Sequence, residues 1–148
     1  MDETWVLIDP RTGLHVRWYF WLRVLDEVNR STRYGDPFGL LILEAATSRR
    51  AGEKLLDEAA SAVPATIRST DLGGRLGPGH VGVLLTHQDE ASARQARDRI
   101  LLRLAHDTPS GVTWRSELYS YPEHAAEISK LLTTGGSERE GAPAARTA

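Results

Sequence analysis

The run Phe38-Gly-Leu-Leu-Ile-Leu-Glu-Ala45 constrains the fold of this chain more than any other feature. It is apolar almost throughout and has the length of a strand, without the alternation of a strand that has one face in water. Such a run is typical of a central strand that is buried on both faces. The rest of the chain must therefore supply elements that cover a sheet.

The segments around this strand have the patterns of helices and of further strands. Apolar spacing and end signals predict helices over 15–33, 48–67, 89–106 and 122–132, with Pro64 kinking or shortening the second. Alternating apolar residues around a Gly-Pro-Gly turn predict a hairpin within 68–85, and 111–121 has the pattern of a strand. The order predicts an α/β sandwich, with a mostly antiparallel sheet covered by helices. Small and polar residues predict a disordered tail over 133–148.

Length and composition set the outer bounds. A chain of 148 residues, 41% of them hydrophobic, fits one domain, which we expect over 1–132. The net charge of −2 gives no general attraction for nucleic acid. The absence of cysteine excludes disulfides and thiolate metal sites, and no apolar stretch approaches the roughly 18 to 20 residues of a membrane span. These features predict a cytoplasmic protein without a membrane span or a nucleic-acid partner.

Two stretches of the sequence resemble motifs of GGDEF domains, the diguanylate cyclases that make cyclic di-GMP from two GTP. The stretch from Asp9 to Phe20 is similar to the DxLTGLxNRxxF motif with which these domains open. Arg75-Leu-Gly-Pro-Gly-His-Val81 falls at the place of their RxGGDEF signature, and the order of elements agrees from Asp9 to about Leu132. The resemblance implies a nucleotidyl-cyclase-like sandwich with a ferredoxin-like core and a role in bacterial signalling.

The departures from that family predict a degenerate domain without cyclase activity. In the family, carboxylates hold two divalent metals, and such hard ions prefer oxygen ligands. Glu44 takes the place of one carboxylate by resemblance, but Gly79 and His80 stand where the signature has Asp and Glu. The segment that reads guanine is largely deleted before Gly52-Glu53, and the late lysine motif has no counterpart. We therefore expect no catalytic residue, no metal and no cofactor; the remaining enzymatic option is acid–base chemistry by His80 with Glu44 and Glu53, without a nucleophile.

A third motif keeps the family pattern. Arg68-Ser-Thr-Asp71 is an RxxD sequence whose distance from Gly77 matches the family's inhibitory site for cyclic di-GMP, and Arg99 falls where the family completes that site. A guanidinium can bind a phosphate or the Hoogsteen edge of guanine, and a carboxylate can accept from guanine N1 and N2. We expect cyclic di-GMP to bind at Arg68, Asp71 and Arg99. The alternative is a solvated turn with a weak surface ion pair between Arg68 and Asp71.

The first helix carries a second apolar stripe. Trp18, Leu22 and Leu25 recur at i, i+4 and i+7, where the family usually has charges, beside the expected core residues Phe20 and Val24. The stripe either fills the core or forms an interface with a protein partner or a second copy. The alternative function is therefore a scaffold that binds no nucleotide and uses this stripe.

Overall fold

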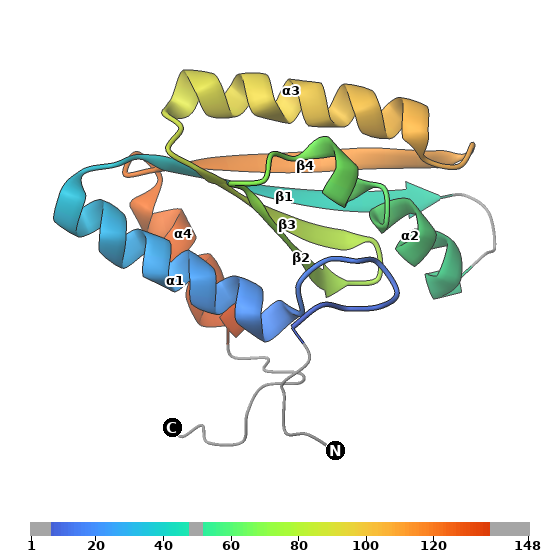
Figure 1. The fold of residues 1–148 in the computed structure, drawn as a ribbon, viewed down its shortest axis with the longest axis horizontal. Coiled ribbons are helices and arrows are strands. Elements are labelled where there is room, and N and C mark those ends of the chain that lie inside the picture. The colour runs from blue at the N-terminus through green and yellow to red at the C-terminus, as the bar shows by residue number, and fades with distance from the viewer. Residues whose placement is uncertain (1–6, 48–51, 137–148) are drawn as a thin grey trace, which may run out of the picture.

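The structure is a computed structural model that describes residues 7–47 and 52–136. Its elements are α1 (Arg17–Tyr34), β1 (Phe38–Thr47), α2 (Gly52–Ala60), the 3₁₀ helix η1 (Val63–Thr66), β2 (Leu72–Gly77), β3 (His80–Thr86), α3 (Glu90–Asp107), β4 (Val112–Tyr121) and α4 (Ala125–Gly136). The strands form one four-stranded sheet in the order β2-β3-β1-β4, and each neighbouring pair is antiparallel. In Figure 1, α3 and α2 lie over one face of the sheet, and α1 and α4 lie over the other. The predicted α/β sandwich is confirmed, with a sheet that is antiparallel throughout.

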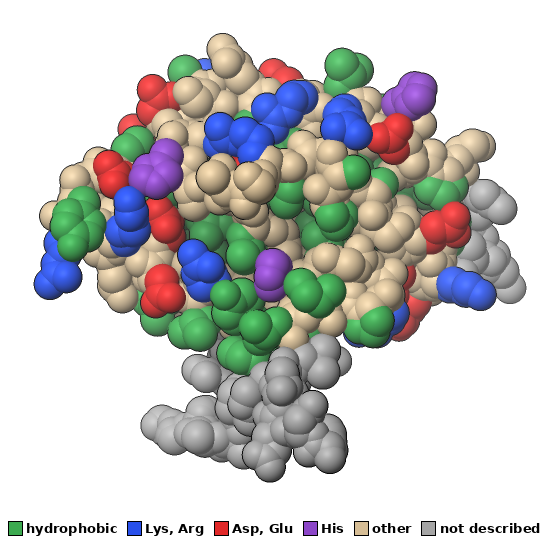
Figure 2. Space-filling model, in the orientation of Figure 1, with side chains coloured by type: hydrophobic (Ala, Val, Ile, Leu, Met, Phe, Trp, Pro, Cys, Tyr) green, Lys and Arg blue, Asp and Glu red, His purple; other side chains and the backbone are tan. Residues whose placement is uncertain are grey.

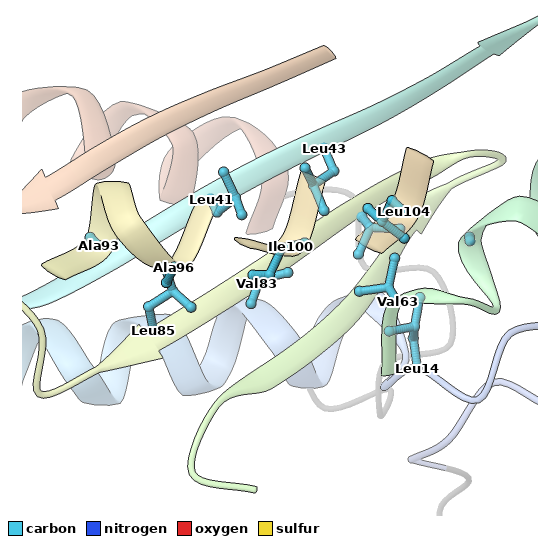
Figure 3. Packing of buried hydrophobic residues seen from close by; sticks show 12 residues of the cluster. Leu14, Leu41, Leu43, Val63, Val83, Leu85, Ala93, Ala96, Ile100 and Leu104 are labelled. Carbon is cyan, nitrogen blue, oxygen red and sulfur yellow. The ribbon is translucent and has the colours of Figure 1, made fainter. Parts of the chain in front are cut away.

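The central strand β1 is buried on both faces, as its sequence predicts. Leu41 and Leu43 pack with Ile100 of α3 in the cluster drawn in Figure 3. Phe38 and Leu40, on the opposite face, belong to the cluster formed with α1 and α4. All five side chains are fully buried, and burying each one stabilises the fold by about 1.5–3 kcal/mol. The continuous apolar run is thus explained by helices on both sides. None of the helices in the described part of the chain is long and apolar enough to cross a membrane.

The ring of Phe20 lies on a part of the sheet that has no side chains. Gly74 of β2 and Gly82 of β3 are register partners. A Cβ added at Gly82 would lie 2.5 Å from Phe20 Cε2, and one at Gly74 would also collide with Phe20. The two glycines therefore allow α1 to approach the hairpin closely.

Two helices differ from the prediction at their ends. The helix expected over 48–67 ends at Ala60, because Pro64 lies in the 3₁₀ turn η1 and has no N–H with which to continue an α-helix. The helix expected over 122–132 begins at Ala125 and continues to Gly136, so the predicted tail is wrong for 133–136. An added Cβ at Gly135 would lie 2.6 Å from Cε2 of Trp21, so this last turn packs on α1. Residues 48–51 and 137–148, which these predictions also cover, lie outside the described residues.

Candidate functional site

The turn of the β2–β3 hairpin is packed against its neighbours. Gly79 has a φ of +72°, in the left-handed region that favours glycine, and its carbonyl accepts from Ala45 N at 2.8 Å. A Cβ added at Gly79 would lie 3.2 Å from Leu56 Cβ of α2 and 3.3 Å from the Ala45 carbonyl oxygen. The predicted hairpin is confirmed, and α2 lies directly against its turn.

The residues at the signature position do not fit the two-metal site that the resemblance implies. Glu44 and His80 are register partners on β1 and β3, with Nε2 of His80 3.5 Å from Oε2 of Glu44 and both side chains partly exposed. Glu53 is exposed on the first turn of α2. Among the described residues, no three His, Cys, Asp or Glu side chains are grouped so that they could hold a metal ion. Imidazole is a poor Mg²⁺ ligand and Gly79 offers no side chain, so the donors are wrong for this ion.

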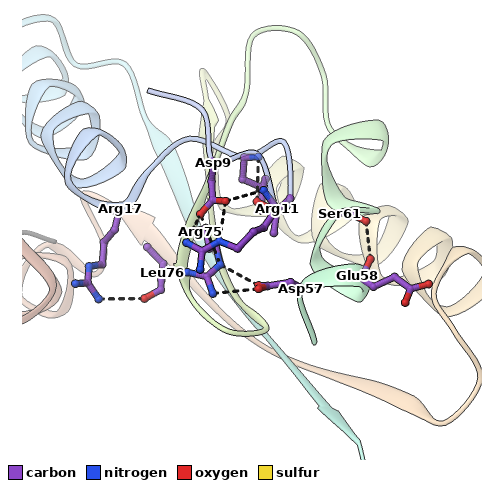
Figure 4. A network of polar contacts seen from close by, with 10 residues as sticks. Asp9, Arg11, Arg17, Asp57, Glu58, Ser61, Arg75 and Leu76 are labelled. Atoms are coloured by element: carbon purple, nitrogen blue, oxygen red, sulfur yellow. Dashed lines mark hydrogen bonds and ion pairs between the residues drawn. The ribbon is translucent and has the colours of Figure 1, made fainter. Parts of the chain in front are cut away.

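A buried cluster of charges lies beside the turn (Figure 4). The side chain of Arg75, on β2, is only 7% exposed; its Nε lies 2.9 Å from Asp57 Oδ1 and its Nη2 3.3 Å from Asp57 Oδ2. The same Nε is 3.8 Å from Asp9 Oδ2, and Asp9 also accepts from the backbone and the guanidinium of Arg11, both at 2.8 Å. One guanidinium thus joins the hairpin to α2 through charge-assisted hydrogen bonds and to the N-terminal turn through an ion pair.

The pKa of Asp9 depends on burial, which raises it, and on the neighbouring arginines, which lower it. Burial by itself would raise the pKa of Asp9, because a carboxylate loses the water that stabilises its charge. The hydrogen bonds from the Arg11 side chain and backbone, with the positive charges of Arg11 and Arg75, outweigh burial and hold the pKa below its ordinary value of 3.8. Asp9 is therefore ionised at neutral pH and compensates the buried charge of Arg75.

The other end of the hairpin begins with Arg68 and Asp71. The Asp71 side chain has no exposed surface and accepts from the Arg68 backbone N at 3.1 Å, from Nε at 3.3 Å and from Nη2 at 3.4 Å. The Arg68 side chain is 50% exposed. The buried amide of Gln88 satisfies both of its neighbours when its nitrogen donates to the Ser92 carbonyl at 3.0 Å and its oxygen accepts from Arg68 Nη2. The predicted ion pair is present, but its carboxylate is buried rather than solvated.

Arg99 lies on the flank of α3 that faces this segment. It follows Ser92 by seven residues and precedes Arg103 by four, so the three share one side of the helix. Arg103 Nη1 donates to the Ala65 carbonyl at 2.8 Å, which places η1 along this side. Arg99 is exposed and makes no hydrogen bond or ion pair within the described ranges, whereas Arg94 pairs with Glu90 at 3.0 Å. Basic side chains gather over α3 in Figure 2.

The apolar stripe of α1 is mostly outside the core. Leu22 is 45% exposed and Leu25 is 44% exposed, so the alternative in which they fill the core is wrong. Phe20 and Val24 are fully buried and already fill the space between α1 and the sheet, while Trp18 is half-buried. Figure 2 shows hydrophobic side chains gathered at the lower edge of the molecule, over the N-terminal half of α1. The stripe is therefore available at the surface.

Sequence reasoning missed Asp57 and Gln88. Asp57 lies among the leucines and alanines of an amphipathic helix, where a single carboxylate gives no sign that it is buried against Arg75. Gln88 lies in the β3–α3 connection, and only its contact with Arg68 identifies it. A basic residue within the apolar pattern of a strand, as at Arg75, was the available signal that a buried partner was needed.

The comparisons with known proteins identify the fold. No protein-family model matches the sequence, and no curated protein matches it. The diguanylate cyclase SiaD from Pseudomonas aeruginosa, solved in complex with its activator SiaC, aligns with a TM-score of 0.69 and 22% identity over 88% of this chain, which spans 58% of the SiaD chain. The GGDEF domain of FimX from the same organism aligns with a TM-score of 0.68 and 16% identity, over 89% of this chain and 92% of the FimX chain. The GGDEF domain of DgcB from Caulobacter crescentus, solved in complex with c-di-GMP, aligns with a TM-score of 0.71 and 13% identity, over 96% of this chain and 93% of the DgcB chain. The chain has the fold of a GGDEF domain.

Proposed function

We propose that this chain is a degenerate GGDEF domain that makes no cyclic di-GMP and instead binds it beside α3. The observation that carries the proposal is the pair of arginines on one flank of the molecule that retain unused donors. Nη1 of Arg68 has no partner among the described residues, and neither does the guanidinium of Arg99. A ligand with two phosphates and two guanines offers acceptors for both. The solved complex of the DgcB GGDEF domain with c-di-GMP supports the choice of ligand.

Asp71 takes a different role from the one that the resemblance implies. Its carboxylate is covered and is already used by the backbone and guanidinium of Arg68. In this conformation it cannot accept from a guanine edge. We therefore assign the ligand contacts to Arg68 and Arg99, and assign to Asp71 the positioning of Arg68.

The absence of synthesis is proposed on the chemistry of the hairpin turn. Gly79 and His80 replace carboxylates, and Leu56 of α2 packs against the turn where a nucleotide would have to approach. We expect purified protein with GTP and Mg²⁺ or Mn²⁺ to form no cyclic di-GMP above a protein-free control. Product that disappears in Glu44→Ala would show that the domain is a cyclase.

Calorimetric titration with cyclic di-GMP tests the binding proposal. A hydrogen bond to a charged group contributes about 1.5–3 kcal/mol, so Arg68→Ala should weaken binding by roughly 10- to 150-fold. Arg94→Ala is the matched control, because Arg94 is exposed on α3, the helix that carries Arg99, and pairs with Glu90. GTP should bind less well, since it lacks the second guanine. If the wild-type protein gives neither heat nor a melting shift at high micromolar cyclic di-GMP, it is not a receptor.

The exposed stripe of Leu22 and Leu25 supports a second function, binding of a protein partner. Exposed leucines on one helix face are an uncommon surface for a domain that acts alone. Leu22→Lys should abolish such binding and leave the melting temperature nearly unchanged, because Leu22 lies at the surface and a lysine there can keep its charge in water. A large loss of stability would show instead that the leucine is covered in the folded protein.

A further inference from the structure

Strand β4 forms one edge of the sheet. Among the described strands it is hydrogen-bonded to β1 alone, over ten residues and without a register shift. It contains no proline, bulge or lysine, which are among the devices that protect a sheet edge, and its charged side chains are one of each sign, Arg115 and Glu117. The edge is therefore long, regular and chemically suited to pair with another strand.

The register shows which peptide groups of β4 face outward. Ala45 N donates to the carbonyl of Gly79, which immediately precedes β3, so the odd-numbered residues of β1 bond toward β3. The even-numbered residues of β1 therefore turn their peptide groups toward β4. Because Glu44 is opposite Arg115 and Ile42 is opposite Glu117, the odd-numbered residues of β4 bond to β1. The even-numbered residues of β4 therefore direct their N–H and C=O groups away from the sheet.

Only the middle of this outer edge lacks partners. At one end, Val112 N donates to the Pro109 carbonyl at 3.3 Å. At the other, Ser120 N donates to Nδ1 of His124 at 2.9 Å, and the Ser120 carbonyl accepts from His124 N at 2.6 Å. Between these ends, both outward peptide groups of Trp114, Ser116 and Leu118 have no partner in the described part of the chain.

The outward peptide groups of these three residues can pair with the same groups of a second copy of the chain. If another β4 is placed antiparallel about a two-fold axis at Ser116, then Ser116 faces Ser116 and Trp114 faces Leu118. Those are the hydrogen-bonded positions of the new pair, so every outward N–H and C=O of the three residues gains a partner. The unpaired peptide groups therefore have the number and spacing needed to pair with the same groups of a second copy.

The charges select the same register. In this arrangement the exposed Arg115 of each copy lies directly opposite the exposed Glu117 of the other, at non-hydrogen-bonded positions, where cross-strand side chains are closest. A shift of the axis by one residue in either direction would place Arg115 opposite Arg115 or Glu117 opposite Glu117. Like charges directly opposite are destabilising, so the pattern favours the register centred on Ser116.

We infer that the β4 edge is a homodimerisation surface, through which two copies form one sheet that is continuous across both. This interface is separate from the arginines beside α3 and from the stripe on α1. The six main-chain hydrogen bonds and two charge pairs make it small, and small interfaces of this kind are weak. Dimers should therefore appear at high micromolar protein concentrations.

Concentration-dependent amide exchange locates the interface. In sedimentation equilibrium, the wild-type mass should rise from that of a monomer toward that of a dimer. The amides of Trp114, Ser116 and Leu118 should exchange more slowly as the protein concentration rises. The amides of Arg115 and Glu117, which bond to β1, should be protected at every concentration.

Charge variants test the register. Arg115→Glu and Glu117→Arg each place like charges opposite each other twice in a homodimer, so each should dissociate at least about tenfold more readily. Mixed in equal amounts, the two variants present opposite charges at both pairs and should form a heterodimer. Both positions are exposed, and unchanged melting temperatures would show that the variants fold.

The control variant is Leu22→Lys, which should leave the dimer intact. If charge variants melt early, Ser116→Pro replaces them, because it removes an N–H that faces outward and is compatible with an edge strand. The inference is overturned if the wild-type protein remains monomeric at high micromolar concentration. It is also overturned if the mixed variants stay monomeric, or if Leu22→Lys rather than the β4 variants abolishes dimerisation.

Discussion

The two ends of the β2–β3 hairpin use arginine in opposite ways. At the turn, the buried Arg75 has both Asp57 and Asp9 as partners, and α2 packs over the turn. At the open end, Arg68 is half exposed and has one nitrogen without a partner among the residues that the structure describes, with Arg99 on the neighbouring helix face. A guanidinium that is buried between carboxylates of its own chain serves stability, because a ligand cannot reach it. One with spare donors in water can bind.

The largest expected effect follows from removing the buried arginine. Arg75→Met would leave Asp57 and Asp9 close together without their shared cation, and breaking a buried pair in this way costs about 3–5 kcal/mol. Chemical denaturation measures the loss, with Arg94→Ala as a control that should change stability by no more than about 0.5 kcal/mol. Equal stability of the two variants would contradict the distinction between the hairpin's ends.

The next effect concerns the positioning of Arg68. Asp71→Ala removes the buried acceptor of the Arg68 backbone and side chain, and a hydrogen bond to a charged group contributes about 1.5–3 kcal/mol. We expect a loss of stability of about that size, together with weaker binding of cyclic di-GMP. Asp71→Asn, which keeps one oxygen acceptor, should lose less of both. If Asp71→Ala bound the ligand as well as wild type, Asp71 would have no positioning role.

Acidification distinguishes the two ends further. Asp9 has a folded pKa below its ordinary 3.8, so its stabilisation is present above that value and is lost as the pH falls through the folded pKa. Asp9→Asn should therefore cost about 1.5 kcal/mol at neutral pH, with a difference from wild type that shrinks in acid below the ordinary pKa. Denaturation curves at several pH values check this. A difference that grew on acidification would have the wrong sign.

The smallest expected effect on stability is at Arg99. Because its side chain is exposed and makes no bond within the described part of the chain, Arg99→Ala should change the free energy of unfolding by less than about 0.5 kcal/mol. Its loss should nevertheless weaken cyclic di-GMP binding by roughly tenfold or more. Arg97→Ala, which removes an arginine paired with Asp98 on the same helix, is the control and should bind normally. Equal binding by both variants would remove Arg99 from the site.

Much of the fold could be predicted from local patterns. The strands at Phe38–Thr47 and Val112–Tyr121, the hairpin and the long helices follow from apolar spacing, glycine and proline. Errors came where packing decides the boundary, as at the end of α4, where Gly135 lies against Trp21. The candidate site was located by its motif residues, but the burial of Asp71 and the contact with Gln88 could not be predicted, because they depend on how the loop folds onto α3.

The order of the elements, the two-sided burial of β1 and the lack of carboxylates at Gly79 and His80 were determined by the sequence alone, because each depends on residue types at local spacing. Only the tertiary structure decided that Arg75 would find Asp57, a residue eighteen positions away on another element. It also decided that Arg115 and Glu117 lie on an edge strand rather than inside the sheet. Ion pairs and free edges depend on which elements become neighbours, and the packing of the whole chain determines those neighbours.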